Sequence, residues 1–542
     1  MCSRAPVAVT VVTSLFGVVA THAASTHRSA EAPTSETAVP IAIDLIGRYK
    51  TERSGESAAE ISAFDPESRR LFVTNAADNA IEILNLADPT LPTLIRSIDL
   101  TPFGAGVNSV ATSDGLVAVA VEAERTRDPG GVAMFDVDGR HLHTFEAGHL
   151  PDMVTFTPDA RWLLAANEGE PSDNYKTDPP GSVTVIRLPE NRTLLPYAEV
   201  RKAGFERWDN AGAPDGVRVF GPGASVSQDL EPEYIAVAPD STTAFVVCQE
   251  NNALAILDIE SAEITSLVGL GSKDHALPTN GLDASDRDDG IQITPRPVFG
   301  MRQPDAIAAF GWDDGVYLVT ADEGDARSYD GYGEEARVKD LKLDPQRFPN
   351  AEGLQADESL GRLKVTTAQG DVDGDGDFDE LYAFGARGIS VFDASGRPVM
   401  DSGDAIERLI AQRAPAVFNA AHDRSDAVDS RSDDKGPEPE AIAVSRIGER
   451  VIAFCGLERV GGVVAFDVSD PASGWRSGRV VGYGTSRRLG FGAGAGGDGL
   501  GDSGPEGIIV IEPEDSPDGT RLLVVTHEVS GSVAVYRVTE GS

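Results

Sequence analysis

The sequence predicts an all-β protein, a seven-bladed β-propeller of the WD40/YVTN-like kind with long loop insertions. One pattern of short strands and tight turns recurs seven times along the 542 residues. The strand segments alternate apolar and polar residues and are rich in β-branched residues, which is typical of half-buried strands. Gly 57 and Pro 33 together make up about a sixth of the chain, which favours many turns over long helices.

The repeat is clearest in two segments, ISAFDPESRRLFVTNAADNAIEILNL (61–86) and IAVAPDSTTAFVVCQENNALAILDI (235–259). Each reads as a strand, a Pro-Asp type of turn, a second strand, a polar turn and a third strand. Further copies begin near Val110, Val154, Ile307, Ile442 and Ile508. A unit of three or four antiparallel strands cannot bury both of its faces alone. Seven units stacked around an axis would cover those faces and leave only short edges.

The N-terminal 40 residues precede the first strand of the repeat region. Residues 1–24 combine Arg4, an apolar run and small residues near Ala23, as a secretory signal peptide does. Residues 25–40 are rich in Ser, Thr, Ala, Glu and Pro, which predicts a disordered leader. We therefore expect a secreted protein, periplasmic or extracellular, with its propeller at 41–542 and no transmembrane segment after signal removal.

The two ends of the repeat region predict how the propeller closes. The strand Ile41 to Tyr49 has no partners in its own repeat, and the chain stops soon after the third strand of the last repeat, Ser532 to Val538. The first strand should therefore complete the last blade. Wide repeat spacing predicts insertions at 189–228, 268–300 and 326–380, with a short helix at Ala198 to Arg207.

Charge, hydrophobic content and cysteine content limit what kind of protein this is. The formal net charge of −41 excludes a nucleic-acid binder, which needs an excess of Lys and Arg for phosphate contacts. The 41% of hydrophobic residues suffices for a large core. Cys248 and Cys455 each lie in an apolar strand pattern, which predicts two buried free thiols.

Several long motifs carry a family resemblance. They are VFGPGASVSQDLEPEYIAV (219–237), LDASDRDDG (282–290), MRQPDAIAAF (301–310), ADEGDARSYDGYGEE (321–335), DGDGDFDELYAFGARGISVFDA (373–394) and DDKGPEPEAIAV (433–444). In these motifs the chain resembles the choice-of-anchor I family of secreted bacterial propellers, which includes proteins similar to the mesenchyme-specific cell surface glycoprotein. The resemblance runs from about residue 41 to 540 and implies a propeller fold and export, without defining an activity.

The sharpest chemical motif is an aspartate-rich loop that predicts a Ca²⁺ site. Carboxylates stand at Asp371, Asp373, Asp375, Asp377 and Asp379, and Gly376 stands at the sixth place. This matches the first half of an EF-hand loop, where glycine permits the tight turn that aims the oxygen ligands inward. The twelfth place, usually a bidentate Glu, is Tyr382. Because crowded carboxylates repel one another without a cation, we expect a structural Ca²⁺ rather than a solvated acidic turn.

Aligned repeats predict a ring of ten carboxylates. Five follow a proline just before the inner strand: Asp152, Glu233, Asp305, Glu440 and Glu506. Five follow the second strand: Glu168, Glu250, Glu323, Glu458 and Glu528. These positions lie at the same end of an antiparallel strand pair, so all ten should surround one mouth of a central channel. Arg327, Arg387 and Arg459 are candidate partners or anion clamps.

The ring has a structural and a functional interpretation. Acidic residues repeated in every blade can cap backbone N–H groups, and this interpretation is slightly favoured for the set that follows proline. The loops Asn167 to Glu170 and Asp322 to Arg327 carry further acids and flexible glycines, which favours a site. Glu168, Glu323, Asp325 and Arg327 are therefore the candidate catalytic residues.

Two function classes remain open. One is a calcium-stabilised, monomeric propeller that binds an unknown ligand or surface component. The alternative is a Ca²⁺-dependent phosphoester hydrolase, a phosphatase or phosphodiesterase similar in plan to propeller phytases and alkaline phosphatases. The fold cannot choose between them, because propellers host many functions. We favour the binding protein, since the sequence shows no positively charged phosphate pocket.

Overall fold

The computed structural model describes residues 39–53, 55, 57–125, 128–423, 427–473, 479–488 and 501–541. The predicted signal peptide and nearly all of the predicted leader lie outside these residues.

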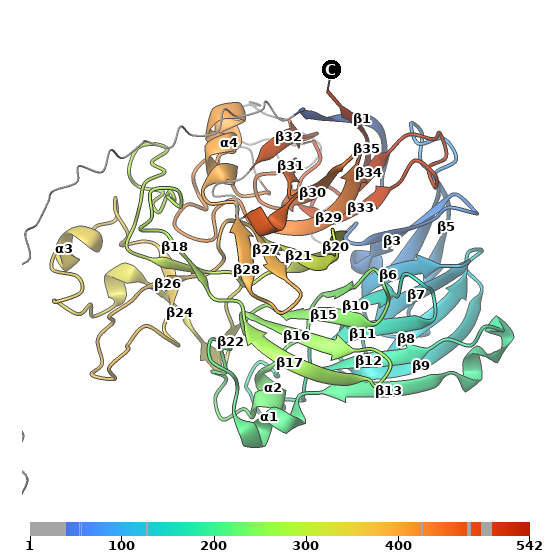
Figure 1. Cartoon of the computed structure of the whole chain (residues 1–542), viewed down its shortest axis with the longest axis horizontal. Helices are drawn as coiled ribbons and strands as arrows, with labels where there is room; N and C mark the ends of the chain where they lie inside the picture. Colours follow the sequence, from blue (N-terminus) through green and yellow to red (C-terminus); the bar gives the residue numbers. More distant parts are fainter. Residues whose placement is uncertain are drawn as a thin grey trace, which may run out of the picture. The chain divides into compact units, whose positions relative to one another are not determined.

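The repeats form seven four-stranded antiparallel sheets, numbered here in chain order (Figure 1). Sheets 1 to 4 are built from consecutive strands: β2 (Ser62–Asp65), β3 (Arg70–Asn75), β4 (Ala80–Asn85) and β5 (Thr93–Asp99); β6 (Val107–Ser113), β7 (Leu116–Val121), β8 (Pro129–Asp136) and β9 (His141–His149); β10 (Pro151–Phe156), β11 (Trp162–Asn167), β12 (Ser182–Arg187) and β13 (Glu199–Gly204); β14 (Ile235–Val237), β15 (Thr243–Cys248), β16 (Ala253–Asp258) and β17 (Glu263–Gly269).

Sheets 5 to 7 follow the same order with two departures. Sheet 5 skips an insertion between its second and third strands, and sheet 7 takes its last strand from the start of the described chain. Their strands are β20 (Ala306–Trp312), β21 (Gly315–Asp322), β27 (Gly388–Asp393) and β28 (Pro398–Asp401); β29 (Pro439–Ile447), β30 (Arg450–Leu457), β31 (Val463–Asp467) and β32 (Val480–Gly484); β33 (Pro505–Ile511), β34 (Leu522–His527), β35 (Ser532–Glu540) and β1 (Ile41–Lys50).

The first strands of the sheets lie against one another. β2 contacts β6, β6 contacts β10, and the series continues through β14, β20 and β29 to β33, which contacts β2. Successive sheets therefore stand side by side and cover one another's faces. This is the arrangement of a β-propeller, and the prediction of an all-β propeller is confirmed.

The predicted pairing of the two ends of the repeat region is present. β1 runs antiparallel to β35 from Ile41 opposite Glu540 to Lys50 opposite Ser532, with one register shift between Leu45 and Gly47. β1 therefore covers the edge that β35 would otherwise expose.

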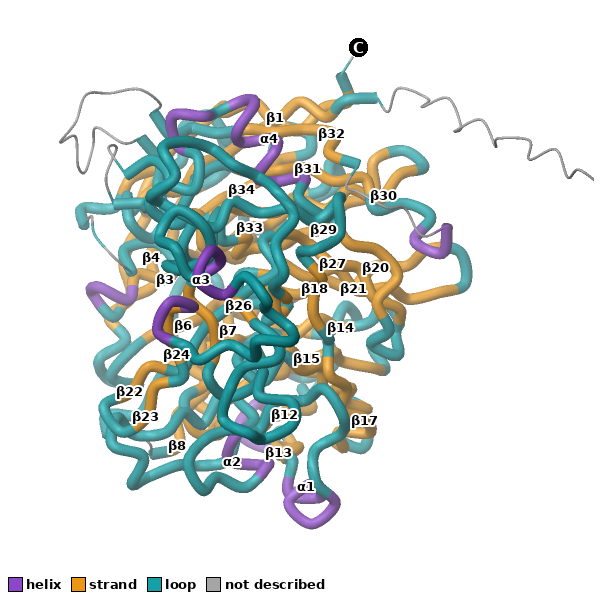
Figure 2. Tube along the Cα trace, turned by 90° about the vertical axis from the view of Figure 1, so that its left-hand side faces the viewer, coloured by secondary structure: helices purple, strands orange, loops and turns teal. Residues whose placement is uncertain are grey.

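The two insertions in and before sheet 5 fold together. The order β18 (Ser272–Asp274), β19 (Phe299–Met301), β26 (Tyr382–Ala383), β25 (Lys364–Thr366) and β24 (Glu335–Arg337) makes one five-stranded sheet. β18 and β19 come from the first insertion, and the other three strands come from the second. The small hairpin of β22 (Ser328–Tyr329) and β23 (Tyr332–Gly333) precedes β24. Figure 2 faces this region, where loops predominate over strands.

Helices are few and short in the described residues: α1 (Glu206–Ala211), α2 (Val226–Asp229), α3 (Ala351–Leu354) and α4 (Ala405–Arg413). The helix expected at Ala198 to Arg207 is wrong. Residues 199–204 form β13 instead, because they pair with β12 as the fourth strand of sheet 3, and the helix begins at Glu206. Within the described ranges, no helix combines the length and the apolar character needed to cross a bilayer.

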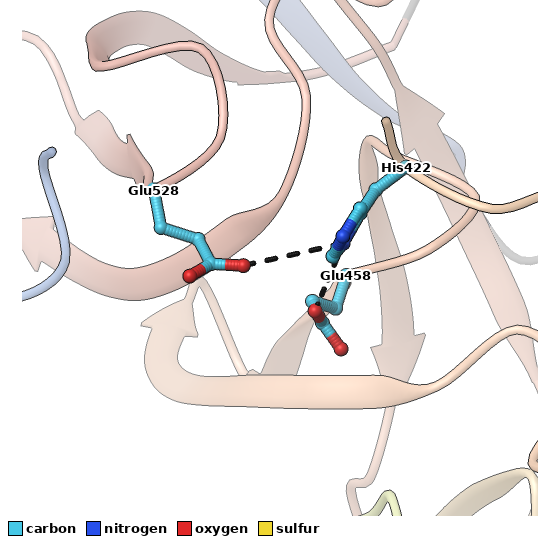
Figure 3. Close-up of side chains that lie close together, drawn as sticks. All are labelled: His422, Glu458 and Glu528. Carbon is cyan, nitrogen blue, oxygen red and sulfur yellow. Dashed lines mark ion pairs between the residues drawn. The ribbon is translucent and has the colours of Figure 1, made fainter. Parts of the chain in front are cut away.

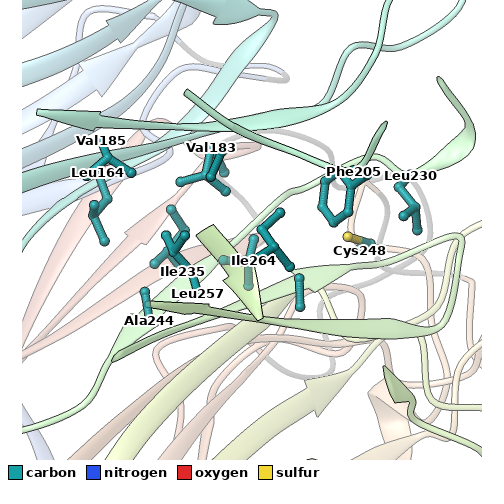
Figure 4. Close-up of a cluster of buried hydrophobic side chains, with 14 of the residues drawn as sticks. Leu164, Val183, Val185, Phe205, Leu230, Ile235, Ala244, Cys248, Leu257 and Ile264 are labelled. Atoms are coloured by element: carbon teal, nitrogen blue, oxygen red, sulfur yellow. The ribbon is translucent and has the colours of Figure 1, made fainter. Parts of the chain in front are cut away.

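The hydrophobic core lies between neighbouring sheets. The cluster between sheets 3 and 4 includes Leu164, Phe205 and Leu257, and Cys248 lies beside Phe205 and Leu230 (Figure 4). Cys248 and Cys455 are both buried and free, as predicted. Most apolar side chains of the second and third strands of the sheets are buried. This agrees with the near-continuous apolar sequence of these strands.

Candidate functional site

The candidate site lies where the first strand of each sheet begins. One residue from every sheet occupies this position, and we name the set the inner ring: Glu60, Asn108, Asp152, Glu233, Asp305, Glu440 and Glu506. Five of the seven line a cavity of about 140 Å³ together with Tyr234. The inner ring therefore gathers six carboxyl groups and one amide.

β-Bulges accompany these carboxyl groups in three sheets. In sheet 3, Pro151 lies opposite Asn167 but Val154 lies opposite Ala165, so two residues of β10 face one residue of β11. The same shift occurs between Pro439 and Ile442 in sheet 6 and between Pro505 and Ile508 in sheet 7. In a regular strand, successive side chains alternate between the two faces of the sheet. A β-bulge breaks this alternation and turns one side chain in a new direction. In these three sheets the Pro-Asp or Pro-Glu pair thus marks the start of the first strand and the position of its bulge.

A wider pocket of about 400 Å³, which we name the acidic mouth, adjoins the inner ring. Its wall carries the carboxyl side chains Glu233, Asp305, Glu323, Asp325, Glu440, Glu458, Glu506 and Glu528, together with Gln249, His422, Lys435 and Arg459. Seven of the ten carboxylates predicted to meet at one mouth are therefore brought together. Asp152 lines the smaller cavity instead.

The other two predicted ring members lie outside the lining of the mouth. In sheet 4 the residue that directly follows the second strand is Gln249, which donates from Nε2 to Glu323 Oε2 at 2.9 Å. Glu250 is the second residue after this strand, one position beyond the place that the carboxyl group occupies in sheets 3, 5, 6 and 7. Glu168 is half-buried. Burial, followed by repulsion from Asp152 and Glu170, holds its pKa well above the usual range.

The capping interpretation of the set that follows proline fails in the described residues. No backbone N–H there donates to Asp152, Glu233, Asp305, Glu440 or Glu506. Asp305 instead shares a hydrogen bond with Glu233. A set of carboxyl groups that caps nothing is a better candidate for a site than for a structural corner.

Burial and mutual repulsion raise the pKa values in the inner ring. Burial, followed by repulsion from Glu458, raises the pKa of Asp305 to about 7. Burial, followed by repulsion from Asp305, raises the pKa of Asp152 to about 7. Burial also raises the pKa of Glu60 to about 7. The same causes hold the pKa values of Glu233, Glu440 and Glu506 well above the usual range.

The raised pKa of Asp152 gives a pH-dependent prediction. The native protein binds this proton between about pH 4 and pH 7 and the unfolded chain does not, so the contribution of Asp152 to stability falls as pH rises through that window. Asp152→Asn removes this loss. In chelator, the melting temperature of the variant relative to wild type should therefore rise from pH 5 to pH 8. The exposed control Glu352→Gln should show a flat difference, and a flat difference for Asp152→Asn would contradict the assignment.

Basic side chains neutralise one side of the acidic mouth. Lys435 Nζ binds Glu323 Oε1 and lies 3.3 Å from Glu438 Oε2. Arg431 and Arg459 bind the same Glu438 at 2.7 and 2.9 Å. Burial alone would raise the pKa of Glu438, but these three cations outweigh it and hold the pKa below the usual range.

His422 joins the mouth between two of its carboxyl groups (Figure 3). His422 Nδ1 lies 3.0 Å from Glu458 Oε1 and 4.0 Å from Glu528 Oε1. Arg459 Nη1 approaches the imidazole at 2.7 Å and Glu458 at 3.0 Å. The His422 imidazole therefore lies among the carboxyl groups of Glu458 and Glu528 and the guanidinium of Arg459, which supplies a positive charge at this place.

The arginine expectations need correction. Arg327 does not face the mouth: its side chain is 1% exposed and binds Asp229 and, at 3.0 Å, Glu231. Arg387 is also buried and binds Glu407 at 2.8 Å. Only Arg459 of the three lines the mouth. Of the other candidate catalytic residues, Glu323 and Asp325 line it, with Lys435 rather than Arg327 as their cation.

The aspartate-rich loop folds around its first residue. Asp371 accepts hydrogen bonds from the backbone N–H groups of Gly374, Asp375 and Gly376 at 2.8, 3.1 and 3.0 Å. Gly374 and Gly376 have φ of 77° and 90°, which glycine adopts without strain. One oxygen each from Asp371, Asp373 and Asp379 lies within 4.8 Å of the others.

The remaining two aspartates of the loop take different places. Asp377 is buried and binds Lys342 at 3.0 Å through Oδ2, while its Oδ1 has no hydrogen-bond partner in the described part of the chain. Asp375 accepts a hydrogen bond from the Asp377 backbone at 3.1 Å and otherwise faces outward. The structure thus brings three of the five predicted ligands together.

Sequence reasoning missed five functional side chains. Glu60 and Asn108 belong to the inner ring but lack a preceding proline, and an alignment on the strand starts would have found them. Lys435 and Glu438 lie in the DDKGPEPE motif directly before β29. His422 comes from a loop that no repeat shares, and the sequence holds no signal for it.

These features define a β-propeller with an acidic pocket at the start of its first strands. The chain belongs to the choice-of-anchor I domain family, whose sequence model matches residues 60–471. The prediction of this family is confirmed.

Two curated proteins are similar over part of the chain. Gigasin-3a of Magallana gigas is 38% identical over 194 residues, which are 34% of this chain and 66% of that protein. The mesenchyme-specific cell surface glycoprotein of Strongylocentrotus purpuratus is 30% identical over 282 residues, which are 45% of this chain and 35% of that protein. The chain thus spans just under two thirds of the first relative and about a third of the second.

Solved structures are similar at a low level. Hydrazine synthase of Kuenenia stuttgartiensis has a TM-score of 0.45 and 12% identity, covering 90% of this chain and 97% of that chain. The β-propeller domain of Cps50 (Swd1) from Myceliophteria thermophila has a TM-score of 0.42 and 11% identity, covering 92% and 100%.

Proposed function

We propose that the chain is an exported, calcium-stabilised, seven-bladed β-propeller that binds a ligand or surface component through its acidic mouth. The blade count is supported by the seven four-stranded sheets and by the contacts that lead from each first strand to the next and from β33 to β2. Export is supported by the predicted signal peptide, and a place outside the cell by the name of the cell surface glycoprotein relative.

The observation that carries the binding function is the charge of the mouth. Eight carboxyl groups line it against one lysine, one arginine and one histidine. Crowded, buried carboxyl groups with raised pKa values ionise more readily when a positively charged group approaches, so such a concave site favours cationic groups. The ligand of this mouth should therefore present a positively charged group.

A charged peptide tests this function directly. A fluorescent hexalysine peptide should bind the full chain at low ionic strength, and added salt should weaken the binding. Glu506→Gln with Glu528→Gln should weaken it further, whereas the exposed pair Glu352→Gln and Glu358→Gln should not. Equal binding of hexalysine and hexaglutamate peptides would reject the acidic mouth as the binding surface.

The calcium part of the proposal rests on the loop at 371–379. Asp371, Asp373 and Asp379 offer oxygens close enough to share one cation, and none of the described residues forms a hydrogen bond with the buried Asp377 Oδ1. Oxygen-only donors around a glycine turn suit Ca²⁺. A bound Ca²⁺ would hold the loop next to β26, one strand of the inserted sheet.

Calcium should stabilise the folded chain through this loop. At free Ca²⁺ of 100 times the dissociation constant, mass action predicts a gain of about 2.7 kcal/mol in the free energy of unfolding. Asp373→Ala with Asp375→Ala should abolish most of this gain, because it removes one converging oxygen donor and one adjacent charge. The matched pair Glu352→Ala and Glu358→Ala, also exposed, should retain it. Calorimetry that finds identical calcium binding in both variants would exclude the loop.

A second candidate function is Ca²⁺-dependent phosphoester hydrolysis. The observation in its favour is that Lys435, Arg459 and His422 line the mouth beside the carboxyl groups, where cationic side chains could bind a phosphate. Hydrolysis of p-nitrophenyl phosphate, measured with Ca²⁺ and with EDTA, tests it. Metal-stimulated turnover that Glu323→Gln abolishes would support a hydrolase, and absence of turnover would leave the binding function.

A further inference from the structure

The two sides of the acidic mouth differ in charge compensation. Lys435, Arg431 and Arg459 converge on Glu438, and two of them also bind Glu323 and Glu458. Lys435 also lies 3.8 Å from Asp325, so three cations compensate the carboxylates on this side of the mouth. The six carboxyl groups of the inner ring have no such partners, since no Lys, Arg or His of the described residues lies within ion-pair distance of any of them.

Two of these uncompensated groups meet a third carboxyl group. Asp305 precedes β20 in sheet 5, and Glu440 lies at the start of β29 in sheet 6. Glu323 directly follows β21. One oxygen of each of the three lies within 4.8 Å of the others, so the ends of two neighbouring sheets present three oxygen donors to one point.

Glu440 is the member whose state needs an explanation. It is 6% exposed and lines the mouth, and its buried Oε2 has no hydrogen-bond partner among the described residues. A buried polar atom left unsatisfied costs about 1–3 kcal/mol, and more when it is charged. Glu323, by contrast, accepts hydrogen bonds from Gln249 and Lys435. The unsatisfied oxygen points to a missing partner, and a cation bound there would supply it and favour the ionised carboxylate.

We propose that Asp305, Glu323 and Glu440 bind a hard divalent cation, of the class that includes Ca²⁺, Mg²⁺ and Mn²⁺. All three donors are carboxylate oxygens, and such donor sets select hard cations over the softer metals that prefer Cys or His. The open mouth admits water to complete the coordination. This site is distinct from the loop at 371–379, and the inference does not rest on the proposed function.

Titration of the full chain with MnCl₂, and separately with CaCl₂ and MgCl₂, tests the site. The variant Asp373→Ala with Asp375→Ala serves as the background, because it removes the loop as a competing site. In this background, calorimetry should still find one saturable site for at least one of the three ions. Adding Glu440→Gln or Asp305→Asn should each weaken its affinity at least about tenfold, which corresponds to 1.4 kcal/mol.

A third variant separates a built site from a diffuse cloud of counter-ions. Glu528→Gln removes a charge from the mouth but no donor from the cluster, so it should change the affinity by less than about threefold, which is under 0.7 kcal/mol. An equal loss for Glu528→Gln and Glu440→Gln would overturn the proposal, as would the absence of saturable binding in the background variant.

Stability in chelator shows that the variants fold. Glu440→Gln replaces a buried carboxyl group with an amide of the same size, so its melting temperature without metal should equal or exceed that of the background, while the metal-induced rise disappears. A variant that keeps the full rise would contradict the site. If hexalysine fails to bind while the saturable metal site remains, the proposed ligand function fails and this inference stands.

Discussion

A chain that begins at residue 51 should melt far below a chain that begins at residue 39. The shorter chain lacks β1 and therefore exposes the edge of β35 along its whole length. It also loses Ile41 and Ile43, which are 4% and 8% exposed and pack against Tyr536 and Val538. Burial of two such side chains contributes at least about 3 kcal/mol.

The same deletion leaves a charged group without its partner. Arg48 binds Asp502 at 2.6 Å, and the Asp502 side chain is 3% exposed. Removing Arg48 adds a destabilising charge to the loss of the strand. Thermal unfolding of the two chains, followed by circular dichroism, measures the combined effect. Equal melting temperatures would show that sheet 7 does not need β1.

Arg327→Met should lower the free energy of unfolding by about 3–5 kcal/mol, because breaking a buried ion pair leaves an uncompensated charge inside the protein. Arg327 binds the side chain of Asp229 and, at 2.6 Å, its carbonyl oxygen. It also binds Glu231 and lies over the ring of Phe220 at 4.5 Å. Methionine keeps the apolar stem but removes the cation that both carboxyl groups share.

An exposed arginine supplies the control for this change. Arg397 pairs with Asp393 at 2.8 Å, and its side chain is 76% exposed. Arg397→Met should therefore cost less than about 1 kcal/mol. Arg327→Lys should lie between the two variants, because it keeps the charge but loses the planar fork. If Arg327→Met costs no more than Arg397→Met in chemical denaturation, the buried ion pair does not stabilise the fold.

The repeated parts of the molecule were predictable from the sequence, because the same order of strands and turns recurs and each copy supports the assignment of the others. The alternating segments, the strand pairing of β1 with β35 and the buried cysteines all follow from local patterns. The helix expected at 198–207 failed for a physical reason. Its residues favour helix, but the open edge of β12 offered six paired positions, and strand pairing outweighed propensity.

The candidate site was predictable only where it repeats. The Pro-Asp and Pro-Glu pairs located most of the inner ring, since they recur at the start of the first strand. Lys435 and His422 could not be placed, because they come from the segment before β29 that has no counterpart in other repeats. Arg327 was misplaced because its partners, Asp229 and Glu231, come from a distant segment that only the fold brings beside it.

The pairing of β1 with β35 also sets the timing of folding. During synthesis β1 emerges before the other described strands, yet its partner is complete only when Glu540 has been made. At 5–20 residues per second, β1 waits on the order of a minute with both edges unpaired and its apolar face uncovered. Throughout that interval the unpaired edges of β1 can pair with strands of other chains, so the final pairing with β35 also removes a site of aggregation.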